Sequence, residues 1–238
     1  MEICAERRIC GNAIIFVKEL KMKIVSYNIS LCTQEKVNKL FDLKADVYVA
    51  PEIACQDKIT IPPEYEMKWN SNCPTKGLGV IWRKGRGKIA DSFKKELAYA
   101  IPIIYEDIFI LGIWPTKLHK NEKYKDIAMD ILNYYAPFFT SKTIITGDFN
   151  LFCKENANHE ADLTSINDFL IKHGFESLYH KESSEEPGSE KKATFFFHNK
   201  ENQPFFLDYT YANFHAASYE LQDFGRDFSD HVGQIVEI

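Results

Sequence analysis

The first half of the chain alternates short, mostly apolar runs with longer stretches in which apolar residues recur every three or four positions. The short runs are rich in Ile, Val and aromatic residues, as buried strands are, whereas the longer stretches have the spacing of amphipathic helices. Gly174 ends the last of these stretches. The pattern predicts strands over residues 23–29, 46–50, 78–82, 109–114 and 143–146, and helices over residues 33–43, 121–139 and 161–173.

The second half is richer in strand-like runs. Residues 193–198, 204–212 and 232–238 are predicted strands, and the polar residues 181–192 are predicted to form an exposed loop. No internal repeat and no long linker divides the sequence, so we expect a single domain over residues 1–238. Residues 1–21 precede the first core strand and are either an N-terminal extension or, in part, a peripheral element.

Composition narrows the class of protein. At 238 residues and 45% hydrophobic, the chain can bury a substantial core. Its net charge of −5 gives no overall basic excess, so a nucleic acid would have to bind a local basic face. The six cysteines, at positions 4, 10, 32, 55, 73 and 153, form no zinc or disulfide pattern, which favours reduced thiols and a cytoplasmic location. The N-terminal segment is a poor secretory signal, and no apolar run is long enough to span a membrane.

Short motifs at the ends of apolar runs carry candidate chemistry. Residues 146–150 (Thr-Gly-Asp-Phe-Asn) follow a predicted strand, and the glycine allows a tight exit that presents Asp148 and Asn150 at the strand end. Taken alone, this motif is equally an ordinary turn. Residues 229–231 (Ser-Asp-His) come just before the last predicted strand and would bring Asp230 and His231 to a sheet edge.

Asp208 is the most unusual acid in the sequence, because it lies in an almost wholly apolar and aromatic run, residues 205–211. A carboxylate in such a run destabilises the fold unless it has a partner. His231 is the natural partner, since a buried carboxylate fixes the imidazole tautomer and favours its protonated form. The alternative, in which Asp208 caps an exposed strand end, fits the apolar flanks less well.

Two further polar residues follow predicted strands. Asn28 ends the first strand and Glu52 follows the second, although either is also common in a turn or a solvated loop. With the motifs above, they supply what hydrolysis of a phosphodiester anion needs. Carboxylates can hold a hard cation such as Mg²⁺, another carboxylate can orient water, and Asn and His can donate to phosphoryl oxygens.

These segments, in this order, resemble those of the endonuclease/exonuclease/phosphatase superfamily, the deoxyribonuclease-like metal-dependent phosphohydrolases. The resemblance implies an α/β fold, a four-layer αββα sandwich in which helices flank two packed mixed β-sheets. Residues 177–195 also look like a compact bacterial branch of the superfamily. The matching segments span nearly the whole chain from Met22 onward: residues 26–28 (Ser-Tyr-Asn), Glu52, and residues 147–150 (Gly-Asp-Phe-Asn), 207–209 (Leu-Asp-Tyr) and 229–231.

The resemblance also implies two groups of site residues around a cation, Mg²⁺ or Mn²⁺ in its place. The metal ligands would be Glu52, assisted by Asn28 and Asp230. The catalytic residues would orient or deprotonate the attacking water, hydrogen-bond the phosphate and stabilise the transition state. Asp148 would act on the water, Asn150 would bind the phosphate, and the His231–Asp208 pair would stabilise the transition state.

The implied activity is a nuclease acting on DNA more than on RNA, but the substrate contacts depart from the pattern. Abasic-site nucleases of the family carry Tyr-x-Pro-Asn where this chain has residues 113–116 (Ile-Trp-Pro-Thr), so Trp114 and Thr116 become candidates for substrate binding. Arg83 and Arg86 lie in a basic, glycine-containing loop that could hold backbone phosphates. A solvated charged loop is an equal alternative.

Two other functions stay open. A phosphatase or phosphodiesterase acting on a small phosphorylated molecule would use the same chemistry, and the acidic balance and short chain favour it. A non-catalytic binding module is less consistent with the sequence, because degenerate members usually lose an acid or the histidine and this chain keeps all of them. We expect a monomer that does not associate with membranes.

Overall fold

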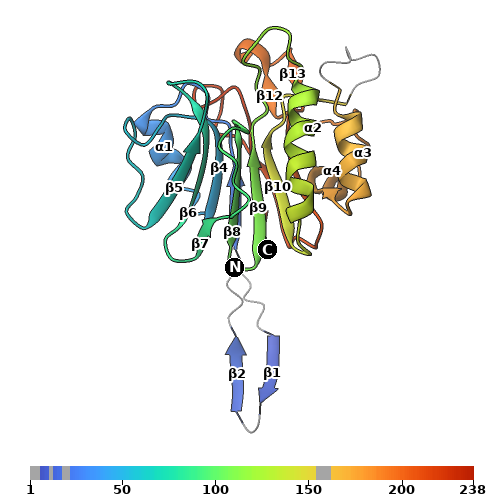
Figure 1. Ribbon diagram of the computed structural model, residues 1–238. Coiled ribbons are helices and arrows are strands. Elements are labelled where there is room, and N and C mark those ends of the chain that lie inside the picture. The colour runs from blue at the N-terminus through green and yellow to red at the C-terminus, as the bar shows by residue number, and fades with distance from the viewer. Residues whose placement is uncertain (1–5, 11–12, 18–21, 154–161) are drawn as a thin grey trace.

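The computed structural model of the chain describes residues 6–10, 13–17, 22–153 and 162–238. Two six-stranded β-sheets lie face to face, with α1 against the outer face of one and α2 and α3 against the outer face of the other (Figure 1). This arrangement confirms the four-layer αββα sandwich. The helices are α1 (Gln34–Phe41), α2 (Tyr124–Tyr135), α3 (Thr164–Lys172) and α4 (Leu178–Ser183), with 3₁₀ turns η1 (Ala136–Phe138) and η2 (Phe197–Asn199).

Each large sheet contains one parallel pair of strands, β3 with β4 and β9 with β10, and is otherwise antiparallel. The first sheet has the order β15 (Ser218–Gln222), β16 (Gly233–Glu237), β3 (Lys23–Ser26), β4 (Val47–Ile53), β6 (Gly77–Arg83), β5 (Tyr65–Asn70). The second has the order β11 (Glu176–Ser177), β14 (Asp208–Ala212), β10 (Thr143–Asp148), β9 (Ile108–Ile113), β8 (Ala100–Tyr105), β7 (Gly87–Ile89). A short hairpin pairs β12 (Phe195–Phe196) with β13 (Pro204–Phe205).

Apolar side chains form two core clusters. The larger one fills the space between the sheets and beneath α2 and α3, and the smaller one lies between the first sheet and α1. Helix α1 shows how the sequence builds this layer: Thr33 caps its N-terminus by accepting from the backbone N–H of Lys36, and the helix buries Val37 and Leu40. Each such buried side chain stabilises the fold by roughly 1.5–3 kcal/mol.

Strands β5, β8 and β15 do not follow from the sequence pattern. Strand β8 contains Pro102, a residue that normally argues against a strand. The carbonyl of Pro102 accepts from Ala90 N just beyond the last paired residue of β7, so the ring nitrogen faces the same side and removes no hydrogen bond to β9. Strands β5 and β15 are edge strands in which half or more of the residues are exposed or half-buried, which weakens the apolar signal.

Several predicted boundaries are wrong. Residues 193–198 contain only the two-residue strand β12, and the run 204–212 is split into β13 and β14. The helix predicted over 121–139 ends at Tyr135, because Pro137 cannot continue the α-helical hydrogen bonds and the chain turns into η1. The loop predicted over 181–192 begins inside α4.

Part of the predicted N-terminal extension is described. Strands β1 (Glu6–Cys10) and β2 (Ala13–Val17) form an antiparallel hairpin that is a sheet of its own. The other residues of 1–21 lie outside the described part of the chain, so the assignment of these residues as an extension stays a prediction. Within the described residues, no helix has the length and apolar character needed to cross a membrane.

Gly147 gives a stability test of the strand exit. Its φ is +151°, and a Cβ there would lie 1.9 Å from the backbone oxygen of Ile113 on the neighbouring strand. We expect Gly147→Ala to lower the free energy of unfolding by about 3 kcal/mol or more, measured by urea denaturation. Gly174→Ala is the matched control, since Gly174 has φ +82° but nothing within 4 Å, and should lose only about 1 kcal/mol. Equal losses at both positions would show that contact with β9 does not decide the residue at 147.

Candidate active site at the strand ends

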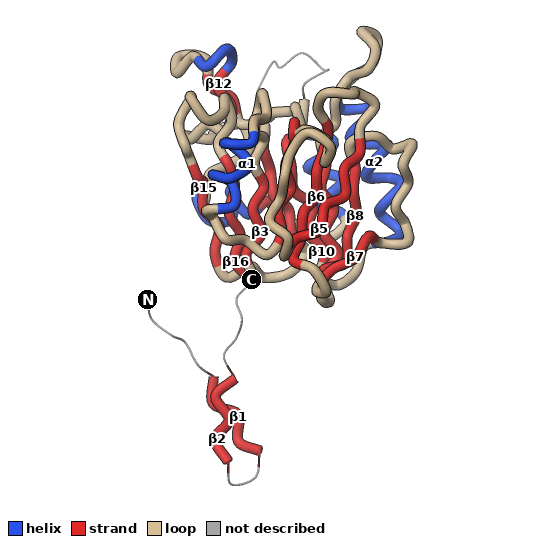
Figure 2. Tube along the Cα trace, turned by 90° about the vertical axis from the view of Figure 1, so that its left-hand side faces the viewer, coloured by secondary structure: helices blue, strands red, loops and turns tan. Residues whose placement is uncertain are grey.

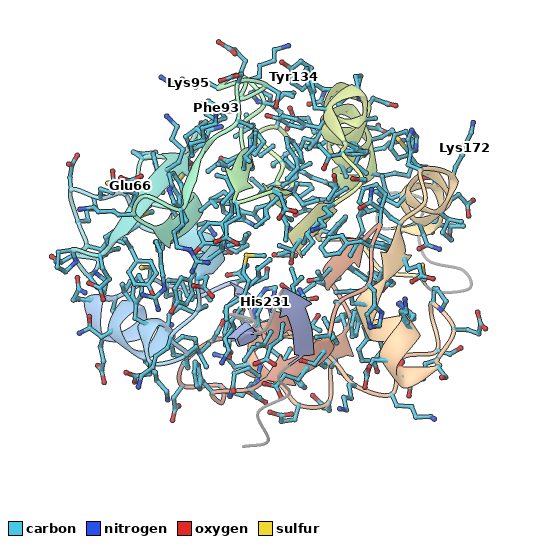
Figure 3. The ribbon with its side chains drawn as sticks, turned by 90° about the horizontal axis from the view of Figure 1, so that it is seen from below. Glu66, Phe93, Lys95, Tyr134, Lys172 and His231 are labelled. Atoms are coloured by element: carbon cyan, nitrogen blue, oxygen red, sulfur yellow. The ribbon has the colours of Figure 1, made fainter. Side chains whose placement is uncertain are left out.

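The site lies where the chain leaves the parallel strands, near the middle of the molecule seen along the strands. Figure 3 shows His231 close to the centre of this view, whereas Tyr134 of α2 and Lys172 of α3 lie toward its edge. Figure 2 shows β12 above the sheets, at the end opposite the C-terminus. The hairpin reaches the site directly, because Phe195 and His231 form an isolated β-bridge and their rings lie 4.7 Å apart.

Asp148 ends β10 and is the meeting point of the two sheets. Its Oδ2 accepts a hydrogen bond of 3.0 Å from Nδ2 of Asn28, which follows β3 in the other sheet. Its Oδ1 accepts from the backbone N–H of Asn150 at 2.9 Å, and Asn150 Nδ2 donates to the carbonyl of Pro115. Only 1% of the surface of Asp148 is exposed, and these hydrogen-bond donors fix the orientation of its buried carboxylate.

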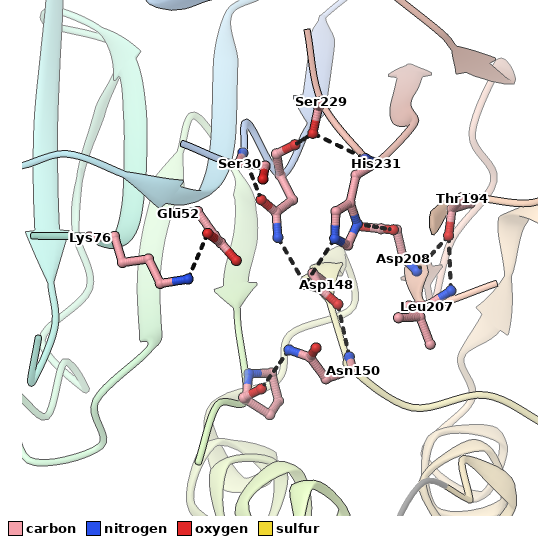
Figure 4. Close-up of polar contacts among 12 residues, drawn as sticks. Ser30, Glu52, Lys76, Asp148, Asn150, Thr194, Leu207, Asp208, Ser229 and His231 are labelled. Carbon is pink, nitrogen blue, oxygen red and sulfur yellow. Dashed lines mark hydrogen bonds and ion pairs between the residues drawn. The ribbon is translucent and has the colours of Figure 1, made fainter. Parts of the chain in front are cut away.

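His231 and Asp208 form the buried pair that the sequence predicts. Nδ1 of His231 lies 2.9 Å from Oδ2 of Asp208, and Nε2 lies 3.9 Å from Oδ2 of Asp148 (Figure 4). Asp208 is fixed in turn through its backbone, since its N–H and that of Leu207 both donate to Oγ1 of Thr194. The imidazole therefore lies between two carboxylates. It is hydrogen-bonded to Asp208 and only near Asp148.

Charge in this cluster follows from burial and pairing. Burial alone would lower the pKa of His231, but the carboxylates of Asp208 and then Asp148 outweigh it and raise the pKa to about 9. Burial raises the pKa of Asp148, while the His231 imidazolium opposes the rise. At neutral pH, His231 is therefore a cationic hydrogen-bond donor, and Asp148 is more basic than an exposed aspartate.

Ser229 and Thr194 are the site residues that sequence reasoning missed. The Ser229 hydroxyl donates to the backbone oxygen of Asn28 at 2.6 Å and accepts from the N–H of His231 at 3.0 Å. It thus ties the end of β3 to the backbone of His231. Ser229 belongs to the Ser-Asp-His motif, so the sequence did contain a signal for it. The partners of Thr194 are backbone amides thirteen and fourteen residues away, so no local motif marks Thr194 in the sequence.

Glu52 occupies a strained position at the edge of the site. The register of β4 with β6 shifts between Ala50 and Ile53, and Glu52 in this bulge has φ +63°. Asn150 likewise has φ +53°. Non-glycine residues seldom adopt this conformation, which costs on the order of 1–3 kcal/mol and is concentrated at functional sites.

Two lysines, also missed from the sequence, face the acids of the site. Lys76 Nζ lies 2.7 Å from Oε2 of Glu52 (Figure 4). Lys36 on α1 donates to the backbone oxygens of Ile29 and Ser30. Burial lowers the pKa of Lys36, and the nearby carboxylates of Asp230 and Glu52 partly restore it. The acids of this site are therefore already partly neutralised by fixed or mobile ammonium groups.

The residues present fit a divalent cation. Ligand atoms of Asp148, Asp208 and His231 lie within 4.8 Å of one another, so this buried group could hold a metal ion. The hydrogen bond between His231 and Asp208 already uses Nδ1, however, and a protonated imidazole does not ligate. On the other side, Oδ1 of Asp230 is buried without a hydrogen-bond partner among the described residues, as expected of an oxygen that faces a cation.

Trp114 and Thr116 are placed differently from each other. Trp114 is 3% exposed and its ring packs edge-on against Tyr99 with 4.9 Å between centroids, so little of it is free to stack a base. Lys76 Nζ lies 5.4 Å from the centre of the Trp114 ring. Thr116 lines a separate hollow of about 140 Å³ that also contains Asn72. Trp114 is thus a wall beside Glu52 and Lys76 rather than an open platform.

Arg83 and Arg86 lie away from the site, contrary to the prediction. Both guanidinium groups pair with Asp46, at 3.1 and 3.2 Å, and Arg86 also pairs with Glu106. Asp46 lies just before β4, whereas Glu52 lies near the end of the strand, six residues later. At 3.3 Å per residue, the two residues are roughly 20 Å apart. These arginines form an ion-pair network at the opposite end of the sheets.

Comparison with solved structures identifies proteins that share this fold. No protein-family model matches the sequence, and no curated protein matches it. Among solved structures, an AP endonuclease from Archaeoglobus fulgidus superposes with a TM-score of 0.69 at 16% identity, over 90% of this chain and 98% of that one. The chain has the fold of the endonuclease/exonuclease/phosphatase superfamily. A 3'-5' exonuclease, NExo, from Neisseria meningitidis gives 0.65 at 13% identity, over 91% and 99%. The endonuclease domain of the telomere-specific retrotransposon TRAS1 gives 0.63 at 11% identity, over 91% and 98%.

The raised pKa of His231 has a consequence for stability that can be measured in metal-free protein. A folded pKa of about 9 against 6.5 unfolded contributes stability that is full below pH 6.5 and is lost as the pH rises through 9. We expect the difference in unfolding free energy between wild type and His231→Gln to shrink by on the order of 2–3 kcal/mol between pH 6 and pH 9.5. Urea denaturation in EDTA measures it. A difference that is constant over this range would mean that His231 is neutral in the folded protein.

Proposed function

We propose that the chain is a hydrolase of phosphodiester bonds that depends on a divalent cation, Mg²⁺ with Mn²⁺ as a substitute, and that its substrate is nucleic acid, DNA more than RNA. One observation carries the proposal: two buried hydrogen-bonded pairs, Asn28–Asp148 and His231–Asp208, are joined by a 3.9 Å ion pair between His231 and Asp148. Glu52 lies beside this cluster (Figure 4), and the carboxylate of Asp230 acts on His231. Buried charges at this density destabilise a fold, so a purely structural role explains them poorly.

The roles follow from the contacts. Glu52 and Asp230 would hold the cation, with the second lone pair of Asn28 Oδ1 available to assist, and the cation would supply charge neutralisation of the phosphate. Asp148, whose pKa is raised by burial, would accept the proton of the attacking water. His231 would donate to the phosphoryl oxygens.

The carbonyl-anchored amide of Asn150 completes the proposed site, because its remaining N–H is a donor for the phosphate or for the water. Trp114, which lies beside Lys76, would border the substrate, whereas Thr116 lines a separate hollow. The nucleic-acid substrate is supported by the two neighbours of similar fold whose names describe an AP endonuclease and a 3'-5' exonuclease. The placement of this chain in a compact bacterial branch stays a prediction, as does its monomeric state.

A small phosphorylated molecule is the second candidate substrate. Glu52 lines a hollow of about 460 Å³ together with Leu31, Cys32, Thr75 and Lys76, which is large enough for such a ligand. The net charge of −5 and the position of Arg83 and Arg86 at the far end of the sheets leave fewer basic groups for a long polyanion. A substrate screen separates the two candidates.

The experiment is a hydrolysis screen with Mg²⁺ or Mn²⁺ against abasic duplex, single-stranded DNA, RNA and small phosphoesters. We expect activity that EDTA abolishes, and a loss of about 10²–10⁴-fold in His231→Ala because the donor to the phosphate is removed. His215→Ala, an exposed histidine beyond β14 at the opposite end of the sheets, is the matched control and should retain activity. Full turnover by His231→Ala, or turnover in EDTA, would remove the proposed function.

A further inference from the structure

Lys76 forms an ion pair with Glu52, the same carboxylate that would bind the divalent cation. Its Nζ lies 2.7 Å from Oε2 of Glu52, whose side chain is only 19% exposed, whereas the Lys76 side chain is 47% exposed. A partly covered carboxylate that already pairs with an ammonium group has less of its charge and fewer of its lone pairs available for a metal ion. The Lys76 ammonium group and a metal ion therefore compete for the carboxylate of Glu52.

Lys76 is free to leave, and Lys36 is not. The ammonium group of Lys36 is anchored by two backbone oxygens, those of Ile29 and Ser30, on a half-buried side chain. Among the described residues, Lys76 Nζ has contacts only with Glu52 and with the face of the Trp114 ring, 5.4 Å away. Lys36 is thus held in place beside the acids, whereas Lys76 can exchange partners by rotating its side chain.

The backbone that carries Lys76 is itself fixed, so the exchange needs no loop movement. The Ser71 hydroxyl donates to the backbone oxygen of Lys76 at 2.6 Å, and Gly77 directly after it begins β6. The ammonium group therefore stays tethered at the rim of the hollow that Glu52 and Thr75 also line. A flexible four-carbon stem on a rigid base can reach either the carboxylate or an anion in the same hollow.

We propose that Lys76 is the phosphate-binding residue of this site: it neutralises Glu52 in the metal-free protein, yields the carboxylate to the divalent cation, and then binds a non-bridging oxygen of the substrate phosphate. The inference rests on the proposed function. It adds that metal binding switches the ammonium group from the protein's own acid to the substrate. The cation replaces the ammonium group on Glu52, and the ammonium group is then available to pair with the anionic phosphate.

The test measures metal binding without substrate. Mn²⁺ is titrated into wild type and Lys76→Met and followed by the EPR signal of free Mn²⁺. We expect the Mn²⁺ dissociation constant to fall by roughly three- to tenfold in Lys76→Met, the effect of removing one half-exposed ion pair. Lys58→Met is the matched control, because Lys58 is exposed and its ammonium group donates to the carbonyl of Pro74 rather than to a carboxylate. It should bind Mn²⁺ as wild type does.

The second arm uses a chromogenic phosphodiester at saturating Mn²⁺. We expect Lys76→Met to raise KM by about tenfold with a smaller change in kcat, and Lys76→Arg to restore both KM and the Mn²⁺ affinity. Unchanged Mn²⁺ affinity in Lys76→Met would overturn the competition for Glu52, and an unchanged KM would overturn the phosphate contact. Either result leaves the proposed function standing if His231→Ala is still inactive, so the two failures are told apart.

Discussion

The hydrogen-bonded pair of His231 and Asp208 is the interaction on which the rest of the site depends. A carboxylate and an imidazole, each almost fully buried, are tolerated only because each compensates the charge of the other. Their pairing fixes which ring nitrogen faces Asp148, and it keeps the imidazole protonated near neutrality. Removing either partner would leave an uncompensated charge in the interior, so the constraint is both structural and chemical.

The fold supplies the second constraint, because it brings the ends of parallel strands from two different sheets into contact. Asn28 follows a strand of one sheet and Asp148 ends a strand of the other, and a single 3.0 Å hydrogen bond joins them. Gly147 permits the close approach of β10 to Ile113 of β9 directly before Asp148, and Glu52 and Asn150 nearby have left-handed backbone. Backbone strain and buried charge are both unfavourable for folding, and both are concentrated in this small region.

The sequence predicted the acids, amides and histidine that the fold brings together because most of them stand at the end of an apolar run, and Asp208 stands within one. Asp208 could be assigned a partner from the cost of burying its charge alone, and the structure places His231 there. Arg83 and Arg86 were misplaced for the opposite reason: local basic composition says nothing about which end of a strand faces the site. Lys76 and Thr194 act through contacts that depend on the folded register, and edge strands such as β15 bury too little to show a pattern.

The most direct test of the central claim, that these residues surround one cation and one phosphate, is a crystal structure with Mn²⁺ and a non-hydrolysable phosphodiester analogue. We expect an anomalous Mn²⁺ peak within coordination distance of Glu52, the analogue's phosphate between that ion and His231, and the His231–Asp208 hydrogen bond intact. An Mn²⁺ ion bound between Asp208 and His231 with that hydrogen bond broken, or no ion beside Glu52 at saturating Mn²⁺, would contradict the account.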